Sequence, residues 1–358
     1  MTLERPNIAR MHGYTPGEQP DAATTIKLNT NENPYPPSPQ VAAALAAIDI
    51  ASLRRYPPPL ATPFRQAASA YHGISPDNIV ATNGGDELLR LAITTFVDSG
   101  ETIVTTQPSY SLYPVLADVQ SCQLVELPLD DDWRMPQDFL AGAIVAQAKM
   151  IILVNPHAPT GCLLPATYLA QLASAFSGVL LVDEAYVDFV DPELGYDSVA
   201  LIREHENILI LRTMSKGYSL AGLRFGYGIG AASLINPMLY KTRDSYNTDF
   251  IAQRLATAAI ESVDYARNTW RQVREQRSRL REGLNALGLG TGDSQSNFLL
   301  ATIPDAIGAE TLYKQLKAHH ILVRYFDQPR LRDKLRITVG SAEENQTLLQ
   351  TLRALVGQ

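Results

Sequence analysis

The chain has few cysteines, no basic stripe and no long apolar run. Its two cysteines, Cys122 and Cys162, form no CxxC pair, so neither a disulfide framework nor a metal site is indicated. The net charge of −7 argues against nucleic-acid binding. No apolar run approaches the roughly 20 residues that span a bilayer, and Met1 to Arg10 lacks the apolar core of a signal peptide. We therefore expect a cytoplasmic protein with neither a membrane nor a nucleic-acid partner.

The composition is that of a globular protein, and the length of 358 residues predicts two domains. From about residue 75, short apolar β-rich runs alternate with helical patterns. Continuous apolar strands with intervening helices favour an α/β fold, in which helices cover both faces of a mainly parallel sheet. The predicted strands are 78–82, 102–105, 150–154, 179–182 and 208–211.

The pattern changes toward the C-terminus. A long helical stretch over 250–288 is followed by further elements: strands at 297–301, 321–324 and 335–339, with helices at 310–319 and at the end. This order predicts a small α+β unit that packs with the N-terminal segment. We therefore expect a large domain of residues 45–265 and a small domain of residues 1–44 and 266–358.

Lys216 stands in the loop after the apolar run 208–211. A loop at the carboxyl end of a parallel strand faces the crevice where α/β proteins bind ligands. An amine there can form a Schiff base with a carbonyl cofactor, and Thr213, Ser215 and Arg224 can hold a phosphate beside it. Taken alone, Lys216 is more simply explained as a surface lysine in a polar turn, and only the features that follow reverse this.

Two more polar features follow predicted strands. The turn 83–87 contains Gly84, Gly85 and Asp86 and opens a helix, which suits an anion, although a plain strand-to-helix turn has the same pattern. Asp183 ends the strand 179–182, where a buried carboxylate needs a partner such as a protonated pyridine nitrogen. An acid in this position can also be a helix cap.

Three side chains complete the pattern. Asn155, after the strand 150–154, can donate to a phenolate oxygen on a cofactor ring. Tyr110 can stack on a flat ring, and a core tyrosine is the alternative. Tyr56, in a loop before the large domain, can reach a phosphate, in this subunit or in another one. Each signal is weak alone, and together they predict one cofactor site at the strand ends.

With these residues in place, the chain resembles the fold-type I pyridoxal-phosphate enzymes of the aspartate aminotransferase superfamily, and within it the histidinol-phosphate aminotransferases. One departure is His157-Ala158, where two asparagines are commoner. The resemblance rests on segments along nearly the whole chain: 14–17, 27–29, 31–34, 55–57, 85–87, 155–156, 159–161, 183–186, 215–216, 220–224, 322–326, 335–340 and 343–345.

The resemblance implies a cofactor, pyridoxal 5′-phosphate, bound to a large domain with a seven-stranded, mainly parallel sheet. Lys216 would carry the cofactor and move the proton at the substrate's α-carbon. The remaining cofactor contacts that it implies divide into ring and phosphate: Asp183 at the ring nitrogen, Asn155 and Tyr186 at the ring oxygen, Tyr110 on the ring face, and Gly85, Asp86, Thr213, Ser215, Arg224 and a partner subunit's Tyr56 at the phosphate.

For the substrate, the resemblance implies that Arg336 binds the carboxylate of glutamate or 2-oxoglutarate. Arg324 and Tyr14 would seat a substrate phosphate, with Asn33 as a further substrate-binding residue. The implied protein is a homodimer with shared active sites. It would transfer the amino group between L-histidinol phosphate and 2-oxoglutarate in histidine biosynthesis. The alternatives are an aromatic amino acid aminotransferase and a decarboxylase acting on threonine phosphate.

Overall fold

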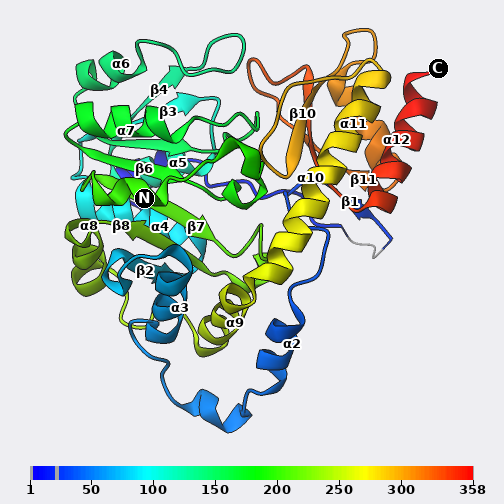
Figure 1. The fold of residues 1–358 in the computed structure, drawn as a ribbon. Helices are drawn as coiled ribbons and strands as arrows, with labels where there is room; N and C mark the ends of the chain where they lie inside the picture. The colour runs from blue at the N-terminus through cyan, green and yellow to red at the C-terminus, as the bar shows by residue number, and fades with distance from the viewer. Residues whose placement is uncertain (1–2, 21–23, 358) are drawn as a thin grey trace.

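A seven-stranded sheet forms the centre of the larger part of the molecule (Figure 1). The computed structural model describes residues 3–20 and 24–357. The strand order is β2-β8-β7-β6-β5-β3-β4, and only β8 runs antiparallel to its neighbours. The expected α/β fold with a mainly parallel, seven-stranded sheet is confirmed. The strands are β2 (Ile79–Thr82), β3 (Thr102–Gln107), β4 (Gln123–Pro128), β5 (Ala148–Val154), β6 (Val179–Asp183), β7 (Ile208–Thr213) and β8 (Gly226–Gly230).

Helices cover both faces of this sheet, as the apolar runs predicted. Alternate strand residues point to opposite faces, so Ile151 packs with one set of helices and Ile152 with the other, and both are fully buried. One face carries α4 (Gly84–Phe96), α5 (Leu112–Gln120) and α8 (Ala232–Pro237). The other carries α3 (Thr62–His72), α6 (Phe139–Val145), α7 (Ala166–Ala175) and α9 (Phe250–Glu261).

Strand β8 did not stand out in the sequence because three of its five residues are glycine, which is a poor strand former. The structure explains these glycines by close packing. A Cβ added to Gly226 would lie 2.7 Å from the backbone carbon of Gly84, and one added to Gly228 would lie 2.9 Å from Leu88. Helix α4 can therefore begin directly against β8. This brings the start of α4 next to the loop that contains Lys216.

The smaller part combines the N-terminal segment with the C-terminal third. A four-stranded antiparallel sheet has the order β12-β13-β10-β9, and β1 pairs with β11 in parallel. Leu28 joins these two sheets, since its N–H donates to the carbonyl of Leu322 and its carbonyl accepts from the N–H of Thr338. The elements are β1 (Ile26–Lys27), β9 (Gly290–Thr291), β10 (Phe298–Thr302), α11 (Ala309–Ala318), β11 (Ile321–Leu322), β12 (Arg324–Tyr325), β13 (Lys334–Thr338) and α12 (Ala342–Val356). Two short N-terminal helices pack on the large part instead: α1 (Pro6–Arg10) contacts α5, and α2 (Pro39–Ala46) contacts α9.

The predicted strand 321–324 is therefore two strands in different sheets, because β11 pairs with the N-terminal segment and β12 with β13. The exact domain boundaries stay a prediction. Residues 1–2, 21–23 and 358, which fall in the expected small domain and N-terminus, lie outside the described residues. Within the described part, no helix is long and apolar enough to cross a membrane.

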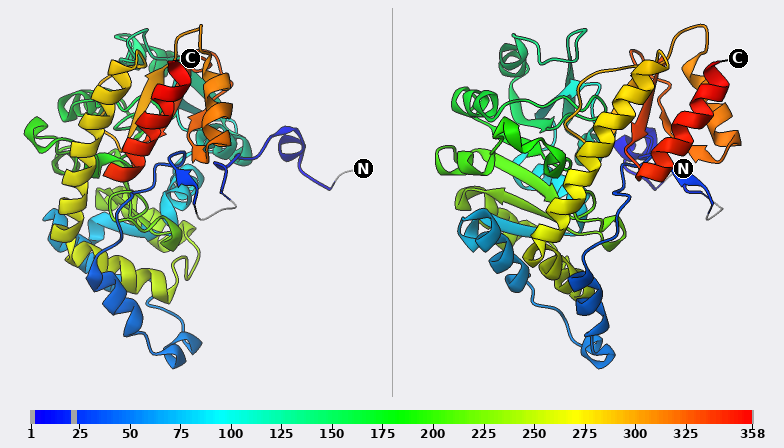
Figure 2. Two further views of the ribbon diagram at one scale, coloured as in Figure 1. Left: turned by 90° about the vertical axis from the view of Figure 1, so that its right-hand side faces the viewer. Right: turned by 45° about the vertical axis from the view of Figure 1, so that its right-hand side comes forward.

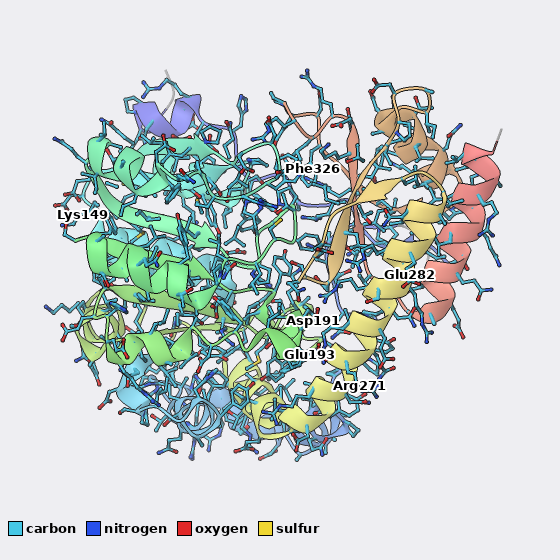
Figure 3. All side chains as sticks on the ribbon, turned by 45° about the horizontal axis from the view of Figure 1, so that its top comes forward. Lys149, Asp191, Glu193, Arg271, Glu282 and Phe326 are labelled. Carbon is cyan, nitrogen blue, oxygen red and sulfur yellow. The ribbon has the colours of Figure 1, made fainter. Side chains whose placement is uncertain are left out.

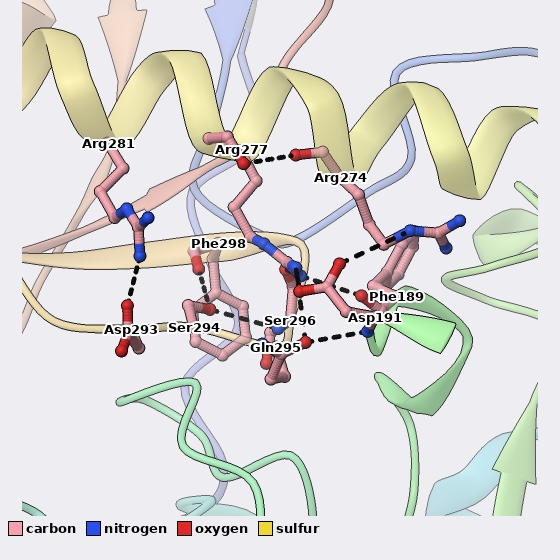
Figure 4. Close-up of polar contacts among 11 residues, drawn as sticks. Phe189, Asp191, Arg274, Arg277, Arg281, Asp293, Ser294, Gln295, Ser296 and Phe298 are labelled. Atoms are coloured by element: carbon pink, nitrogen blue, oxygen red, sulfur yellow. Dashed lines mark hydrogen bonds and ion pairs between the residues drawn. The ribbon is translucent and has the colours of Figure 1, made fainter. Parts of the chain in front are cut away.

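The predicted long helix over 250–288 is two helices that meet at Ser262, α9 and α10 (Val263–Ala286). Helix α10 runs from α9 along the small sheet (Figures 1 and 2). Arg277 of α10 is buried, and its guanidinium donates to the carbonyls of Phe189 and Ser296 and to Asp191 at 3.0 Å (Figure 4). Phe189 follows β6 and Ser296 precedes β10, so this arginine ties the two parts of the chain together.

Candidate active site

A cavity of about 580 Å³ lies between the large sheet and the small one. Its lining comes from the loops after β6 and β7, the start of α4, the N-terminal segment, and β12 and β13 with the loop between them. Phe326, from that last loop, faces the gap between the two parts (Figure 3). The carboxyl ends of the parallel strands thus meet a second wall that the small part supplies.

Lys216 lies in this cavity, as the sequence predicted. Its amine donates to the backbone carbonyl of Thr30 at 2.7 Å. Burial, followed by the positive charge of Arg336, lowers the pKa of Lys216 to about 8. Glu32 opposes this shift, and it is itself paired with Lys27 at 2.5 Å. A lysine with this pKa is partly unprotonated near neutral pH, which is what a nucleophile or proton carrier requires.

Asp183, the last residue of β6, has a carboxylate that is 4% exposed and lines the cavity. The hydroxyl of Tyr113 donates to it at 2.9 Å and the N–H of Ala185 at 3.1 Å. Within the described residues it has no ion pair, and burial raises its pKa to about 6. Two hydrogen bonds do not compensate the buried charge fully, so a cation placed here would be stabilised.

The start of α4 and the loop after β7 form a cradle for an anion. Gly84 has a φ of +78°, and an added Cβ would lie 2.6 Å from the guanidinium of Arg224. The hydroxyls of Thr213 and Ser215 are 3.0 Å apart, and Arg224 donates to Ser215 at 3.4 Å. The helix N-terminus, two hydroxyls and a guanidinium together match the groups that bind a phosphate. Gly85 and Asp86 also line the cavity beside them.

Three tyrosines form part of the same wall. Tyr110 lies edge-on to Tyr14 at 5.8 Å between ring centroids and to Tyr113 at 5.6 Å. Tyr186 packs edge-on against Phe298 at 5.0 Å, and the amine of Lys216 is 6.0 Å from the centre of its ring. These contacts hold flat side chains around the lysine, and Tyr14, Tyr110 and Tyr186 all border the cavity.

Arg324 and Arg336 lie on the wall that the small part supplies. Both guanidiniums are within 5.5 Å of the ring centre of Phe326. Arg336 donates to the carbonyl of Asn29, its Nε has no hydrogen-bond partner, and burial lowers its pKa. In the described part of the chain neither arginine forms an ion pair. Two arginines without carboxylate partners make this wall suited to anionic groups.

These residues fit pyridoxal 5′-phosphate, the cofactor that the resemblance implies. The incompletely compensated carboxylate of Asp183 would hold a protonated ring nitrogen. The hydroxyl–guanidinium cradle of Thr213, Ser215 and Arg224 would hold the phosphate, and Lys216 supplies the amine. The fit rests on side chains from three separate loops, and in the described residues no cluster of His, Cys, Asp and Glu competes as a metal site.

The structure does not bring every predicted residue to the cavity. Asn155 is fully buried, and its side-chain amide donates to Leu164 and Tyr196 and accepts from Leu164. It does not line the cavity, whereas Ala158 of the same loop does. Both amide N–H groups of Asn155 have partners within the protein, and its predicted contact with the cofactor ring stays a prediction.

Asn33 and Tyr56 also lie outside the lining. The amide of Asn33 donates to the carbonyl of Gly217, next to Lys216, at 3.2 Å, so it supports the lysine loop. Tyr56 is 79% exposed and stacks on Tyr246 with ring centroids 4.3 Å apart. Its predicted role in a partner subunit stays a prediction.

Two residues that contact the site were missed as individual candidates. Tyr113, in the first turn of α5, donates to Asp183, and it stands only three residues after Tyr110, which was a candidate. Asn31 donates to Tyr186 at 3.0 Å. It belongs to the Asn-Glu-Asn-Pro segment, but nothing in that segment distinguishes Asn31 from Asn33.

Comparison with known proteins agrees with this site. The family model described as aminotransferase class I and II matches residues 23–352. The chain is 45% identical to histidinol-phosphate aminotransferase 1 of a Nostoc species and 40% identical to a histidinol-phosphate aminotransferase of Geotalea daltonii, each over 98% of both chains.

Solved structures show the same fold. The histidinol-phosphate aminotransferase of Sinorhizobium meliloti, in complex with pyridoxal-5′-phosphate, superposes with a TM-score of 0.91 at 24% identity and covers 100% of this chain and 98% of its own. A putative aminotransferase of Burkholderia pseudomallei superposes with a TM-score of 0.80 at 30% identity, covering 94% of this chain and 99% of its own. The chain therefore belongs to the class I and II aminotransferase family, and within it to the histidinol-phosphate aminotransferases.

Proposed function

We propose that this protein uses pyridoxal 5′-phosphate to transfer the amino group between L-histidinol phosphate and 2-oxoglutarate, in histidine biosynthesis. One observation carries the proposal. A lysine with a lowered pKa lines one cavity together with the carboxylate of Asp183 and the guanidiniums of Arg324 and Arg336, none of which has an ion-pair partner among the described residues. The names of the relatives that match over nearly the whole chain support the choice of substrate.

When bound, the cofactor supplies a carbonyl that takes up the amino group and a protonated ring that withdraws electrons from the substrate's α-carbon. Asp183 would keep the proton on the ring nitrogen, because the resulting positive charge compensates the buried negative charge of its carboxylate. The amine of Lys216 would carry the proton to and from the α-carbon, since a pKa of about 8 permits both protonation states near neutral pH. The walls of the cavity would exclude water from this carbon.

Arg336 and Arg324 would bind the anionic groups of the two substrates in turn. A planar guanidinium pairs with a carboxylate or with a phosphate. Arg336, the more buried, is proposed for the carboxylate of glutamate and 2-oxoglutarate. Arg324 and Tyr14 are proposed for the phosphate of histidinol phosphate.

A homodimer is part of the proposal. Tyr56 is far more exposed than the other predicted site residues and borders a surface hollow with Arg55 and Tyr246. In the dimer, Tyr56 of one subunit would reach the phosphate cradle of the partner subunit. A cytoplasmic location belongs to the same proposal, and both cysteines are free thiols.

A visible-absorbance titration of cofactor-loaded protein tests the substrate. We expect L-histidinol phosphate to convert the cofactor's band at lower concentration than phenylalanine or threonine phosphate, and 2-oxoglutarate to restore it. Conversion by phenylalanine alone would favour an aromatic amino acid aminotransferase. Release of carbon dioxide from threonine phosphate, without need for 2-oxoglutarate, would favour the decarboxylase.

A further inference from the structure

Asn31 occupies an unusual place in the molecule. It lies on the segment after β1, lines the cavity and is only 1% exposed. Its backbone is left-handed, with a φ of +56°, a conformation that asparagine tolerates better than most residues. A buried polar side chain in this conformation is held by its surroundings, so its partners show what it is for.

Three of its four hydrogen bonds go to the small part of the protein. The N–H of Asn31 donates to the hydroxyl of Thr338 at 3.0 Å, and the same hydroxyl donates to the side-chain oxygen of Asn31 at 3.1 Å. The carbonyl of Asn31 accepts from Asn297 at 2.9 Å. Thr338 ends β13 and Asn297 precedes β10, so the small sheet fixes both the backbone and the orientation of the amide.

The fourth bond crosses to the large part. The side-chain N–H of Asn31 donates to the hydroxyl oxygen of Tyr186, in the loop after β6, at 3.0 Å. An amide N–H can only donate, so the tyrosine oxygen accepts, and its own proton is left for another acceptor. The edge-on contact with Phe298 restricts the ring of Tyr186.

We infer that Asn31 is a positioning residue that makes Tyr186 a hydrogen-bond donor to the ring oxygen of the cofactor. The inference rests on the proposed function, since it needs the cofactor in place. Of the two residues predicted for this oxygen, Tyr186 lines the cavity, and it is the one that Asn31 contacts. The small sheet orients the amide of Asn31. The hydrogen bond from Asn31 to Tyr186 therefore makes the orientation of the tyrosine hydroxyl depend on where the small part lies.

The visible band of a bound cofactor gives a direct readout. Its pH midpoint reports the proton on the nitrogen that joins Lys216 to the cofactor. When this proton leaves, the ring oxygen carries more negative charge. A donor to that oxygen favours the deprotonated form, so its loss raises the midpoint.

The sharpest variant is Asn31→Gly. Glycine adopts a positive φ freely and keeps both backbone bonds, so only the amide is lost. We expect the midpoint to rise by about half to one pH unit, as the loss of one neutral hydrogen bond implies. Tyr186→Phe should raise it similarly. The double variant should show no further rise over Tyr186→Phe, because Asn31 is inferred to act on the cofactor only through the Tyr186 hydroxyl.

Thr338→Val provides a matched test from outside the cavity. It keeps the shape of the side chain and removes the hydroxyl that orients the amide, so the midpoint should rise in the same direction. An unchanged midpoint in Thr338→Val would overturn the link to the small sheet. An unchanged midpoint in Asn31→Gly or in Tyr186→Phe would overturn the inference itself. If wild-type protein gains no visible band with pyridoxal 5′-phosphate, the proposed function fails as well, which separates the two results.

Discussion

Asp183 and Glu184 are neighbours in the chain, both are carboxylates and both are buried, yet they differ in what surrounds them. Asp183 lines the cavity without an ion pair. Glu184 belongs to what we call the rear network, formed by Glu184, Arg212 and Tyr196 behind the strand ends. There it pairs with Arg212 at 2.7 Å and accepts from Tyr196 at 2.6 Å.

The same contrast divides the cations. Arg212 is compensated inside the protein, whereas Lys216 and Arg336, which line the cavity, are not. A buried charge is expensive unless it is paired. The rear network satisfies its charges within the fold and so acts as structure. The cavity leaves the charges of Asp183, Lys216 and Arg336 for a ligand to compensate, and this difference distinguishes an active site from a buried salt bridge.

Lys216→Ala removes an uncompensated charge from the cavity and should give the largest effect on activity. Turnover should fall by at least about 10⁴-fold, because the amine that would hold the cofactor and move the proton is gone. The melting temperature of the cofactor-free protein should change little, since removing this buried cation relieves its desolvation and costs only the hydrogen bond to the Thr30 carbonyl. Steady-state kinetics and thermal unfolding measure the two quantities. Sustained transamination by this variant would contradict the mechanism.

Arg212→Met and Arg336→Met compare a paired arginine with an unpaired one. Arg212→Met strands the carboxylate of Glu184, so we expect a loss of about 3–5 kcal/mol in the free energy of unfolding. Arg336→Met should leave stability nearly unchanged and weaken kcat/KM for 2-oxoglutarate by roughly 10²–10³-fold. Urea unfolding and steady-state kinetics should separate the two. Equal losses of stability in the two variants would show that the charge of Arg336 is compensated within the protein as fully as that of Arg212.

Asp183→Asn tests the pH dependence in cofactor-free protein. Burial raises the pKa of Asp183 from its ordinary value of 3.8 to about 6, so between these values the folded state keeps a proton that the unfolded state has lost. Stability due to this group therefore falls as pH rises through that window, by about 3 kcal/mol in all. Asp183→Asn should gain stability relative to wild type at pH 7.5 but not at pH 4.

Glu184→Gln serves as the contrast, because it leaves Arg212 without its partner and should lose stability at pH 7.5. The buried carboxyl of Asp188, whose pKa burial raises to about 7, is present both in wild type and in Asp183→Asn and cancels in that comparison. Melting temperatures at the two pH values measure the effect. A loss of stability in Asp183→Asn at pH 7.5 would contradict the prediction.

Local pattern was enough to predict much of this protein. The apolar runs that became β5, β6 and β7 are buried on both faces, and such strands need no partner to be recognised. The polar residues that follow these runs were predicted to meet, and Asp183, Lys216, Arg224 and Tyr186 do line one cavity. Parallel strands place their carboxyl ends at one edge, so the sequence order of strand and loop carries this information.

Other elements could not be found this way. Strand β8 has too many glycines for a strand pattern, and its place follows from close contact with α4. Strand β4 lies at the edge of the sheet and is only partly buried, so its pattern is weak. The break at Ser262 between α9 and α10 lies in a region whose helical periodicity continues across it.

The sequence by itself determined the class of fold, the cofactor chemistry and the lysine that performs it, because these depend on residue types at strand ends. Only the tertiary structure decided how each charge is compensated. It placed Glu184 beside Arg212 and left Asp183 facing the cavity. It also gave the side chain of Asn155 a partner in Tyr196, and it placed Asn31 between Thr338 and Tyr186. Such partners lie far apart in the chain, and they meet only when the two sheets pack together.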